Sequence, residues 1–294
     1  MSGRVLCLAL SGLLALAQPC LALPPAPSPA PARASQRSTL QPLRLQTVGT
    51  RTQLQVAVVS YRGKGGVQVD LVGAVHIGDA AYYQALQKRL NAYPKLLYEM
   101  VKPEGAAVTG RAGGGVSGLQ RWAKDLLQLQ FQLDALDYDR PNFVHADIAP
   151  ERMLQHLMDH AGGIAAMLLR WSVRDMARQH YSDGSPRFGT FGLLTATLSG
   201  DRASALKRML ARELVEMDHN LAELGDDKSP GSILIAQRNQ VAIDVLRQTL
   251  AKGVRKVGIF YGAAHLPDFD LRLRRDLGFK RGTTVWMTAW DMPK

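Results

Sequence analysis

The order of apolar and polar residues predicts strands alternating with helices over much of the chain. TQLQVAVVSYR and VQVDLVG are rich in β-branched residues and partly alternate, and the turn-forming run RGKGG separates them, so we predict a hairpin over residues 52–73. A helical pattern follows in AAYYQALQKRLNAY, with Asp79 at the N-cap position and Pro94 closing it. KLLYEMV is then predicted to be a short apolar strand, with Glu99 near its carboxyl end.

The same alternation returns at the C-terminal end. SILIAQRNQVAIDVLRQTLAKG is predicted to be a helix that stops at Gly253, and KVGIFY a strand. FDLRLRRDLG is predicted to be a second helix and TTVWMTAW the last strand. This order favours an α/β fold with a mostly parallel or mixed central sheet and flanking helices.

Between these two parts lies a middle region, about 119–224, that is predicted to be a large helical insertion. Leu206, Leu210 and Leu214 recur at helical spacing, as in one buried stripe, and PNFVHADI is a candidate short strand. GGIAAMLLRWSV and FGLLTATL are too short to cross a bilayer, so we expect no stable membrane span. The Gly-rich residues 105–118 are predicted to be a mobile loop that cradles no phosphate.

The N-terminal residues have the pattern of an export signal. A basic start and the apolar run VLCLALSGLLALA predict a signal peptide over residues 1–22, and the Pro/Ala-rich residues 23–42 an extended tether. Residues 43–294 then form a single domain. Because Cys7 and Cys20 are the two cysteines, the exported domain has no disulfide, which is compatible with a bacterial periplasm.

The formal charge of +11 comes from basic residues that are interleaved with acids, as in RLRRDLGFKRG. No nucleic-acid motif accompanies them, so we expect no nucleic-acid partner. A soluble basic surface is the simplest interpretation, and attraction to an anionic lipid or polymer is the alternative.

One short motif occurs twice. GAVHIGD begins at Gly73 and GAAHLPD begins at Gly262, and each follows a predicted strand and precedes a predicted helix. In open α/β sheets, ligands bind beyond the carboxyl ends of the strands. We therefore expect His76 and His265 to meet there, at an exposed edge of the sheet. The alternative is that both are capping turns whose histidines only satisfy backbone groups.

Two imidazoles at one sheet edge can bind a transition metal, or they can act as base and electrophile without one. A metal needs a third ligand, and Glu99 is the natural candidate because it ends the next strand of the unit. HLMDH also carries two histidines, His156 and His160, one helical turn apart. It lacks the Glu of a zinc motif, and a solvated helix flank explains it better.

Arg238 lies in the middle of an apolar helix face formed by Leu234, Ile235, Val241, Ala242 and Val245. A charge that points into packed structure needs a partner, and Glu99 or an anionic part of a substrate would provide one. The alternative is that the stem packs while the guanidinium reaches water.

Together, GAVH, LLYEMV, IAQRN and IFYGAAHLPDF resemble the TraB/Tiki family, which belongs with the erythromycin-esterase-like and ChaN-like proteins. The resemblance covers residues 67–101 and 233–279 and is thin between them. It implies a site formed by His76, His265 and Glu99, with Arg238 and Asn239 in the helical motif. Gln237 departs from the acid that many relatives have there. Tiki members resemble metal-dependent peptidases, whereas other relatives bind haem or use a histidine base without metal.

From these features we expect an exported, metal-dependent hydrolase that acts on a peptide or small-molecule substrate. A divalent transition metal (Mn, Co or Zn) would be held by His76, His265 and Glu99. Two alternatives stay open: a metal-free esterase with His76 as its base, and a non-catalytic periplasmic binder of haem or of a signalling peptide.

Overall fold

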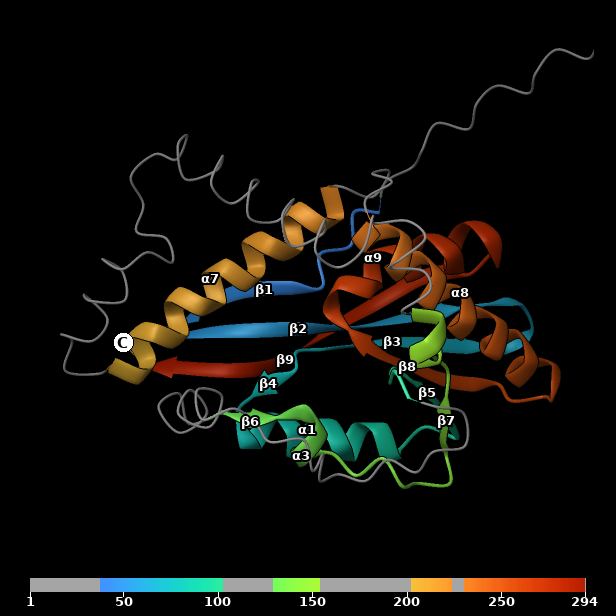
Figure 1. Ribbon diagram of the computed structural model, residues 1–294, viewed down its shortest axis with the longest axis horizontal. Coiled ribbons are helices and arrows are strands. Elements are labelled where there is room, and N and C mark those ends of the chain that lie inside the picture. The colour runs from blue at the N-terminus through green and yellow to red at the C-terminus, as the bar shows by residue number, and fades with distance from the viewer. Residues whose placement is uncertain (1–37, 103–128, 154–201, 224–229, 294) are drawn as a thin grey trace, which may run out of the picture. The chain divides into compact units, whose positions relative to one another are not determined.

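A mixed sheet of seven strands lies at the centre of the computed structural model (Figure 1). The structure describes residues 38–102, 129–153, 202–223 and 230–293. They belong to one unit, Ser35–Lys294. Several predicted features lie outside the described residues: the signal peptide, the Gly-rich loop, the pair His156 and His160, and most of the middle region.

Four strands of the sheet are parallel and hydrogen-bond in the order β3 (Gln68–Ala74), β8 (Lys256–Gly262), β5 (Lys95–Tyr98) and β7 (Phe143–His145). The long strand β2 (Arg51–Arg62) is antiparallel to β3, which confirms the predicted hairpin. Its other partners, β1 (Leu43–Val48) and β9 (Lys280–Pro293), are also antiparallel to it. The predicted α/β fold with a mixed sheet is therefore confirmed.

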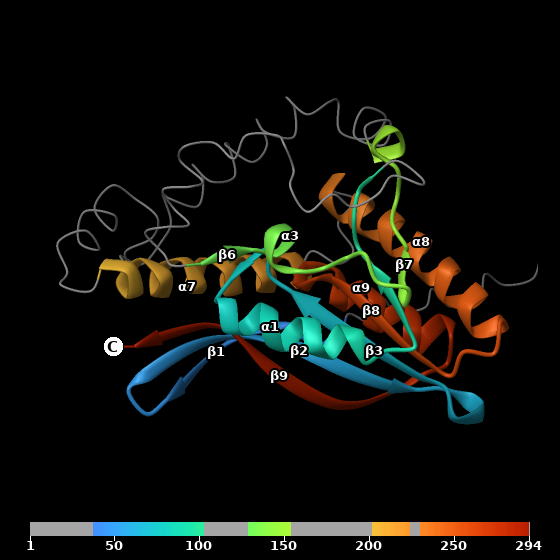
Figure 2. The same cartoon turned by 90° about the horizontal axis from the view of Figure 1, so that it is seen from below.

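Helices cover both faces of this sheet, because successive residues of its strands point to opposite sides. On β8, Phe260 packs into one cluster with α1 (Ala80–Asn91) and α7 (Arg202–Glu223), while Ile259 and Tyr261 pack into a second. The second cluster contains α8 (Pro230–Ala251) and α9 (Leu266–Leu271) (Figures 1 and 2). The long α8 ends before Gly253, whose φ of 85° favours glycine, as the sequence predicts.

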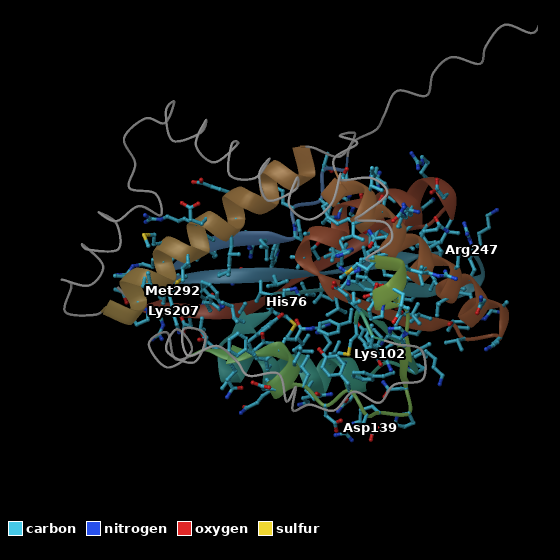
Figure 3. All side chains as sticks on the ribbon, viewed as in Figure 1. His76, Lys102, Asp139, Lys207, Arg247 and Met292 are labelled. Atoms are coloured by element: carbon cyan, nitrogen blue, oxygen red, sulfur yellow. The ribbon has the colours of Figure 1, made fainter. Side chains whose placement is uncertain are left out.

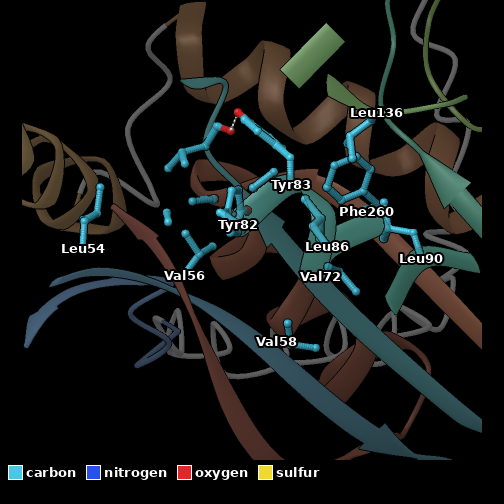
Figure 4. Packing of buried hydrophobic residues seen from close by; sticks show 14 of the residues in the cluster. Leu54, Val56, Val58, Val72, Tyr82, Tyr83, Leu86, Leu90, Leu136 and Phe260 are labelled. Atoms are coloured by element: carbon cyan, nitrogen blue, oxygen red, sulfur yellow. Dashed lines mark hydrogen bonds between the residues drawn. The ribbon is translucent and has the colours of Figure 1, made fainter. Parts of the chain in front are cut away.

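Helix α1 illustrates how apolar spacing builds the first cluster. Tyr82, Tyr83, Leu86 and Leu90 lie on one side of the helix at spacings of three and four, and all are buried (Figure 4). They pack against the sheet through Phe260 and its neighbours on β2 and β3. The apolar pattern predicted this helix with its correct start.

The other short elements are β4 (Ile77–Gly78), β6 (Gln130–Phe131), the single-turn helix α3 (Gln132–Ala135), and the 3-10 turns η1 (Lys64–Gly66) and η2 (Ala263–His265). A π-helical turn η3 (Arg272–Asp276) continues α9. Strand β4 pairs with β6 in a separate two-stranded sheet, so the chain that follows His76 is tied to residues far downstream.

Residues 38–42, at the end of the predicted tether, pack onto the domain. Leu40 is buried in the second cluster, and the hydroxyl of Ser38 donates to Oδ2 of Asp270 at 2.7 Å. Asp270 is fully buried, and it also accepts hydrogen bonds from the hydroxyl of Tyr61 and from Arg281. These partners compensate the buried carboxylate and connect the N-terminal segment to α9 and β9.

Candidate functional site

The two copies of the repeated motif both follow parallel strands, and these strands are neighbours in the sheet. Gly73 and Ala74 end β3, and they pair with Tyr261 and Gly262 at the end of β8. Strand β5 pairs with β8 on the other side, and Glu99 follows its last residue. Since the carboxyl ends of parallel strands meet at one edge, His76, Glu99 and His265 come together there, as predicted.

Gly262 is the point on which the three side chains converge. A β-carbon on this glycine would lie 3.3 Å from Oε2 of Glu99, 3.8 Å from Nε2 of His76 and 3.9 Å from Cδ2 of His265. The Gly262 amide donates a 2.6 Å hydrogen bond to the same Oε2. Glycine thus lets the carboxylate approach the backbone closely.

Gly73, at the same position of the first copy, has a different environment. A β-carbon there would lie 2.8 Å from Val56 and 3.2 Å from Leu266, both in packed structure. A side chain at Gly73 would collide with β2 and α9, whereas a side chain at Gly262 would crowd the Glu99 carboxylate.

The two histidines also differ in exposure. The His76 side chain, labelled in Figure 3, is exposed. The His76 carbonyl accepts a 2.9 Å hydrogen bond from the backbone amide of Gln132. His265 is only 5% exposed and lies in the turn η2, with the ring of Tyr261 edge-on to its imidazole. The expectation that both turns lie at an exposed edge is therefore wrong for the second copy, because α8 packs against η2.

The tautomer of His265 follows from its partners. Nδ2 of Asn239 donates to Oδ2 of Asp268 at 2.8 Å and to the His265 carbonyl at 3.1 Å, and both of these oxygens can only accept. Oδ1 of Asn239 therefore faces Nδ1 of His265, 2.6 Å away, and it too can only accept. We assign the ring hydrogen to Nδ1, which leaves the lone pair on Nε2.

This lone pair faces a carboxylate. Nε2 of His265 lies 3.6 Å from Oε1 of Glu99, too far for a direct hydrogen bond. Burial lowers the pKa of His265 to about 4, so the ring is neutral at pH 7. Burial opposes ionisation of Glu99, but its pKa lies below the usual value. With His265 neutral, the carboxylate is stabilised by Arg238 and by the Gly262 amide, each of which contacts one of its oxygens at 2.6 Å. Two electron-pair donors therefore face one another.

Arg238 compensates the buried carboxylates of the site, as the sequence predicts. Its Nη2 lies 2.6 Å from Oε1 of Glu99 and 2.7 Å from Oδ2 of Asp147, and its Nε donates to Oδ1 of Asp147 at 3.0 Å. Both side chains of the Arg238–Glu99 pair are 13% exposed, and that of Asp147 is fully buried. The bidentate contact fixes the guanidinium beside Glu99.

Sequence reasoning missed Asp147 as a site residue. It follows the short strand β7 by two residues, at the same edge of the sheet as Glu99. The rule that selected Glu99, an acid just beyond a strand end, would also have selected Asp147.

The aspartates shared by the two motif copies both hold their turns in place. Asp268 orients Asn239 and accepts a 2.6 Å hydrogen bond from Arg272. Asp79 lies at the N-cap position of α1, as predicted, but it makes no side-chain capping hydrogen bond. It pairs at 3.0 Å with Lys207 of α7, which Figure 3 labels, and accepts the Asp291 amide instead.

The donors of the site suit a divalent transition metal in part. Two ligands bound at about 2.1 Å to a tetrahedral ion lie about 3.4 Å apart, close to the 3.6 Å between His265 and Glu99. Within the described ranges, no three His, Cys, Asp or Glu side chains are already grouped around one point as ligands. The third ligand would be the exposed His76, whose Nε2 lies near Gly262.

Acid should weaken the fold through His265. Its folded pKa of about 4 lies below the ordinary 6.5, so the unfolded chain binds more protons between these values. The contribution is complete above pH 6.5 and falls as pH drops toward 4, by roughly 3 kcal/mol for such a shift. Urea unfolding in chelator at pH 7.5 and 4.5 measures the loss, which His265→Gln should reduce. The exposed His76→Gln should keep the wild-type loss; an unchanged loss in His265→Gln would contradict the assignment.

Comparison of the chain with protein-family models, with curated proteins and with solved structures finds no match.

Proposed function

We propose that the protein is an exported, metal-dependent hydrolase of the TraB/Tiki type, with peptidase-like chemistry and the periplasm as its compartment. The observation that carries this proposal is the neutral Nε2 of His265, which faces the ionised Glu99 across 3.6 Å. A divalent ion that accepts both electron pairs would bridge the two members of this pair, and so would a water molecule that donates a hydrogen bond to each.

A divalent ion (Mn, Co or Zn) held by His76, His265 and Glu99 would supply Lewis acidity and lower the pKa of a bound water. The chain's own groups prepare the site for it. Asn239 keeps the His265 proton on Nδ1, so Nε2 is available without a proton being lost first. Arg238 and the Gly262 amide keep Glu99 ionised and fix its orientation.

The proposed substrate is a peptide or a small molecule with an amide or ester carbonyl. The exposed imidazole of His76 lies on the solvent side of the site, whereas His265 and Glu99 are largely buried. His76 is therefore the first of the three to meet a substrate. Among the described residues, no helix is long and apolar enough to cross a membrane.

A metal-free esterase is the second candidate, and one observation favours it. Both oxygens of Glu99 already accept hydrogen bonds of 2.6 Å, from Arg238 and from the Gly262 amide. A carboxylate engaged in this way can serve as a fixed negative charge beside a histidine base. In this alternative His76 is the base, because its side chain is accessible.

Metal content and chelation test the proposal. We expect protein purified without an affinity tag to contain close to one equivalent of Mn, Co or Zn. Hydrolysis of a panel of peptides and esters should stop after dialysis against chelator and return when one of these ions is added. Full activity in chelator would favour the metal-free esterase. A Soret band without turnover would favour a haem binder and refute both hydrolase proposals.

A further inference from the structure

Basic side chains gather at the end of the sheet opposite the candidate site. Lys95 and Lys256 begin β5 and β8, and the Arg255 carbonyl accepts a hydrogen bond from the Gln68 amide at the start of β3. Strand β8 has seven residues, so its two ends lie about 20 Å apart. The basic end is therefore distinct from the site around Gly262.

The antiparallel strands add cations to the same end. Arg62 closes β2 and lies directly opposite Lys280, the first residue of β9. Like charges opposite one another on neighbouring strands destabilise a sheet. Lys64 lies in the turn between β2 and β3, where the Arg255 guanidinium donates to the Gly65 carbonyl.

A cavity of about 430 Å³ opens at this end, between α1 and the start of β8. Its cationic lining residues are Lys88 and Arg89, from the last turn of α1, and Lys256. The Lys256 ammonium lies 5.5 Å from the centre of the Tyr93 ring, which also lines the cavity. A smaller cavity on the other face of the sheet, next to α8, is lined by Lys95 and Lys252.

Asp70, the acid that lines the larger cavity, already has hydrogen-bond partners within the protein. Asp70 is 5% exposed, and it accepts hydrogen bonds from the Tyr93 hydroxyl at 3.0 Å and from the Gln68 amide group at 2.9 Å. Within the part of the chain that the structure describes, none of the cations at this end forms an ion pair with a carboxylate. These cations, which we call the basic end, are Arg62, Lys64, Lys88, Arg89, Lys95, Lys252, Arg255, Lys256 and Lys280.

We propose that the basic end docks on the surface of an anionic phospholipid bilayer, with a lipid phosphate in the cavity between Lys88, Arg89 and Lys256. The cations come from four strands, the helix α1 and two turns, and they spread over one end of the sheet, so that they present a broad positive surface to an anionic bilayer. A lipid phosphate accepts hydrogen bonds from lysine and arginine, and the Tyr93 ring, Met287 and two alanines offer apolar contact to the glycerol beyond it. Docking in this way turns the Gly262 site away from the bilayer.

Vesicle binding tests this inference independently of any hydrolase activity. The full chain, as its cells produce it, is sedimented with phosphatidylcholine vesicles that contain either no phosphatidylglycerol or 40% of it, in low salt and in 0.5 M salt. We expect binding only to the anionic vesicles, and its loss in high salt because the attraction is screened.

Two matched variants separate the basic end from net charge. Lys88→Gln/Arg89→Gln/Lys256→Gln should weaken binding about a hundredfold, since each cation near an anionic surface contributes about 1 kcal/mol, close to a fivefold factor. Arg44→Gln/Arg51→Gln/Arg212→Gln removes the same charge from β1, the start of β2 and α7, and should change binding less than about threefold. Every variant carries the same N-terminal residues, so any membrane affinity of those residues cancels.

Four outcomes would overturn the inference. The first two are no binding to anionic vesicles in low salt and equal losses of binding in the two triple variants. The third is binding of double-stranded DNA as tight as that of vesicles. The fourth is full displacement of the protein from vesicles by 1 mM inorganic phosphate or glycerol phosphate. The last two would identify a general polyanion surface and a site for a free phosphate, respectively.

Discussion

Replacing Arg238 by methionine should destabilise the protein by about 3–5 kcal/mol, the usual cost of leaving a buried charge without its partner. Methionine roughly keeps the volume of the stem but removes the cation between Glu99 and Asp147. The Asp147 side chain is fully buried, so water cannot take the place of the guanidinium. Urea unfolding at pH 7.5 measures the loss, a large part of the 5–15 kcal/mol that stabilises a typical domain.

Two further substitutions make this result specific. Arg238→Lys keeps the charge but loses the paired contact with Asp147, so an intermediate loss is expected. Arg247→Met, on the same helix, removes an arginine whose partner Asp244 is half exposed, and should cost less than about 0.5 kcal/mol. If Arg238→Met were as mild as Arg247→Met, the buried carboxylates would have to be neutral, and the ionised Glu99 of the proposed site would be wrong.

The fold could be predicted where one period of apolar residues dominates a segment. The alternation over residues 52–73 predicted β2 and β3, and the spacing of Tyr82, Tyr83, Leu86 and Leu90 is that of the helix α1. The order of the strands could not be predicted in the same way. Strand β8 inserts between β3 and β5, although only β4 and α1 separate β3 from β5 in the chain. That order depends on packing between segments far apart in sequence, which periodicity does not contain.

The site was predictable as far as strand ends determine it. His76, Glu99 and His265 each follow a parallel strand, and adjacent parallel strands bring their carboxyl ends together. The apolar face of α8 also predicted that Arg238 points inward. What the sequence did not contain is the difference between the two copies of the motif. His76 is followed by β4, which pairs with β6, whereas His265 lies under α8, where Asn239 and Asp268 fix its ring.

Replacing either motif histidine should distinguish a metal-dependent site from a metal-free histidine base. If His76 and His265 bind one ion, His76→Ala and His265→Ala should each abolish stoichiometric binding of Mn, Co or Zn, and activity with it. Asn239→Ala, which releases the His265 ring without removing a ligand, should weaken binding about 10–100-fold. Glu99→Gln should also weaken it strongly, because the amide is a neutral and poorer ligand. Metal analysis and isothermal titration measure these losses.

The buried position of His265 requires a second variant. His265→Ala leaves a cavity beside Tyr261, so His265→Gln, which is closer in volume, is measured with it, and circular dichroism checks that both fold. His145→Gln is the matched control, since the His145 ring contacts the Met100 carbonyl and is not a proposed ligand. It should keep full metal binding.

A metal-free base predicts a different pattern for the same variants. Activity would persist in chelator, and His76→Ala would reduce it about 10²–10⁴-fold, far more than His265→Gln. In the metal site the two histidines are equivalent in effect, because each provides a bond that the other cannot replace. Because His265 is buried and His76 is exposed, the two substitutions should differ in their effect on folding stability but not in their effect on metal binding. Tight stoichiometric binding by the double variant His76→Ala/His265→Gln would rule out the metal site that we propose.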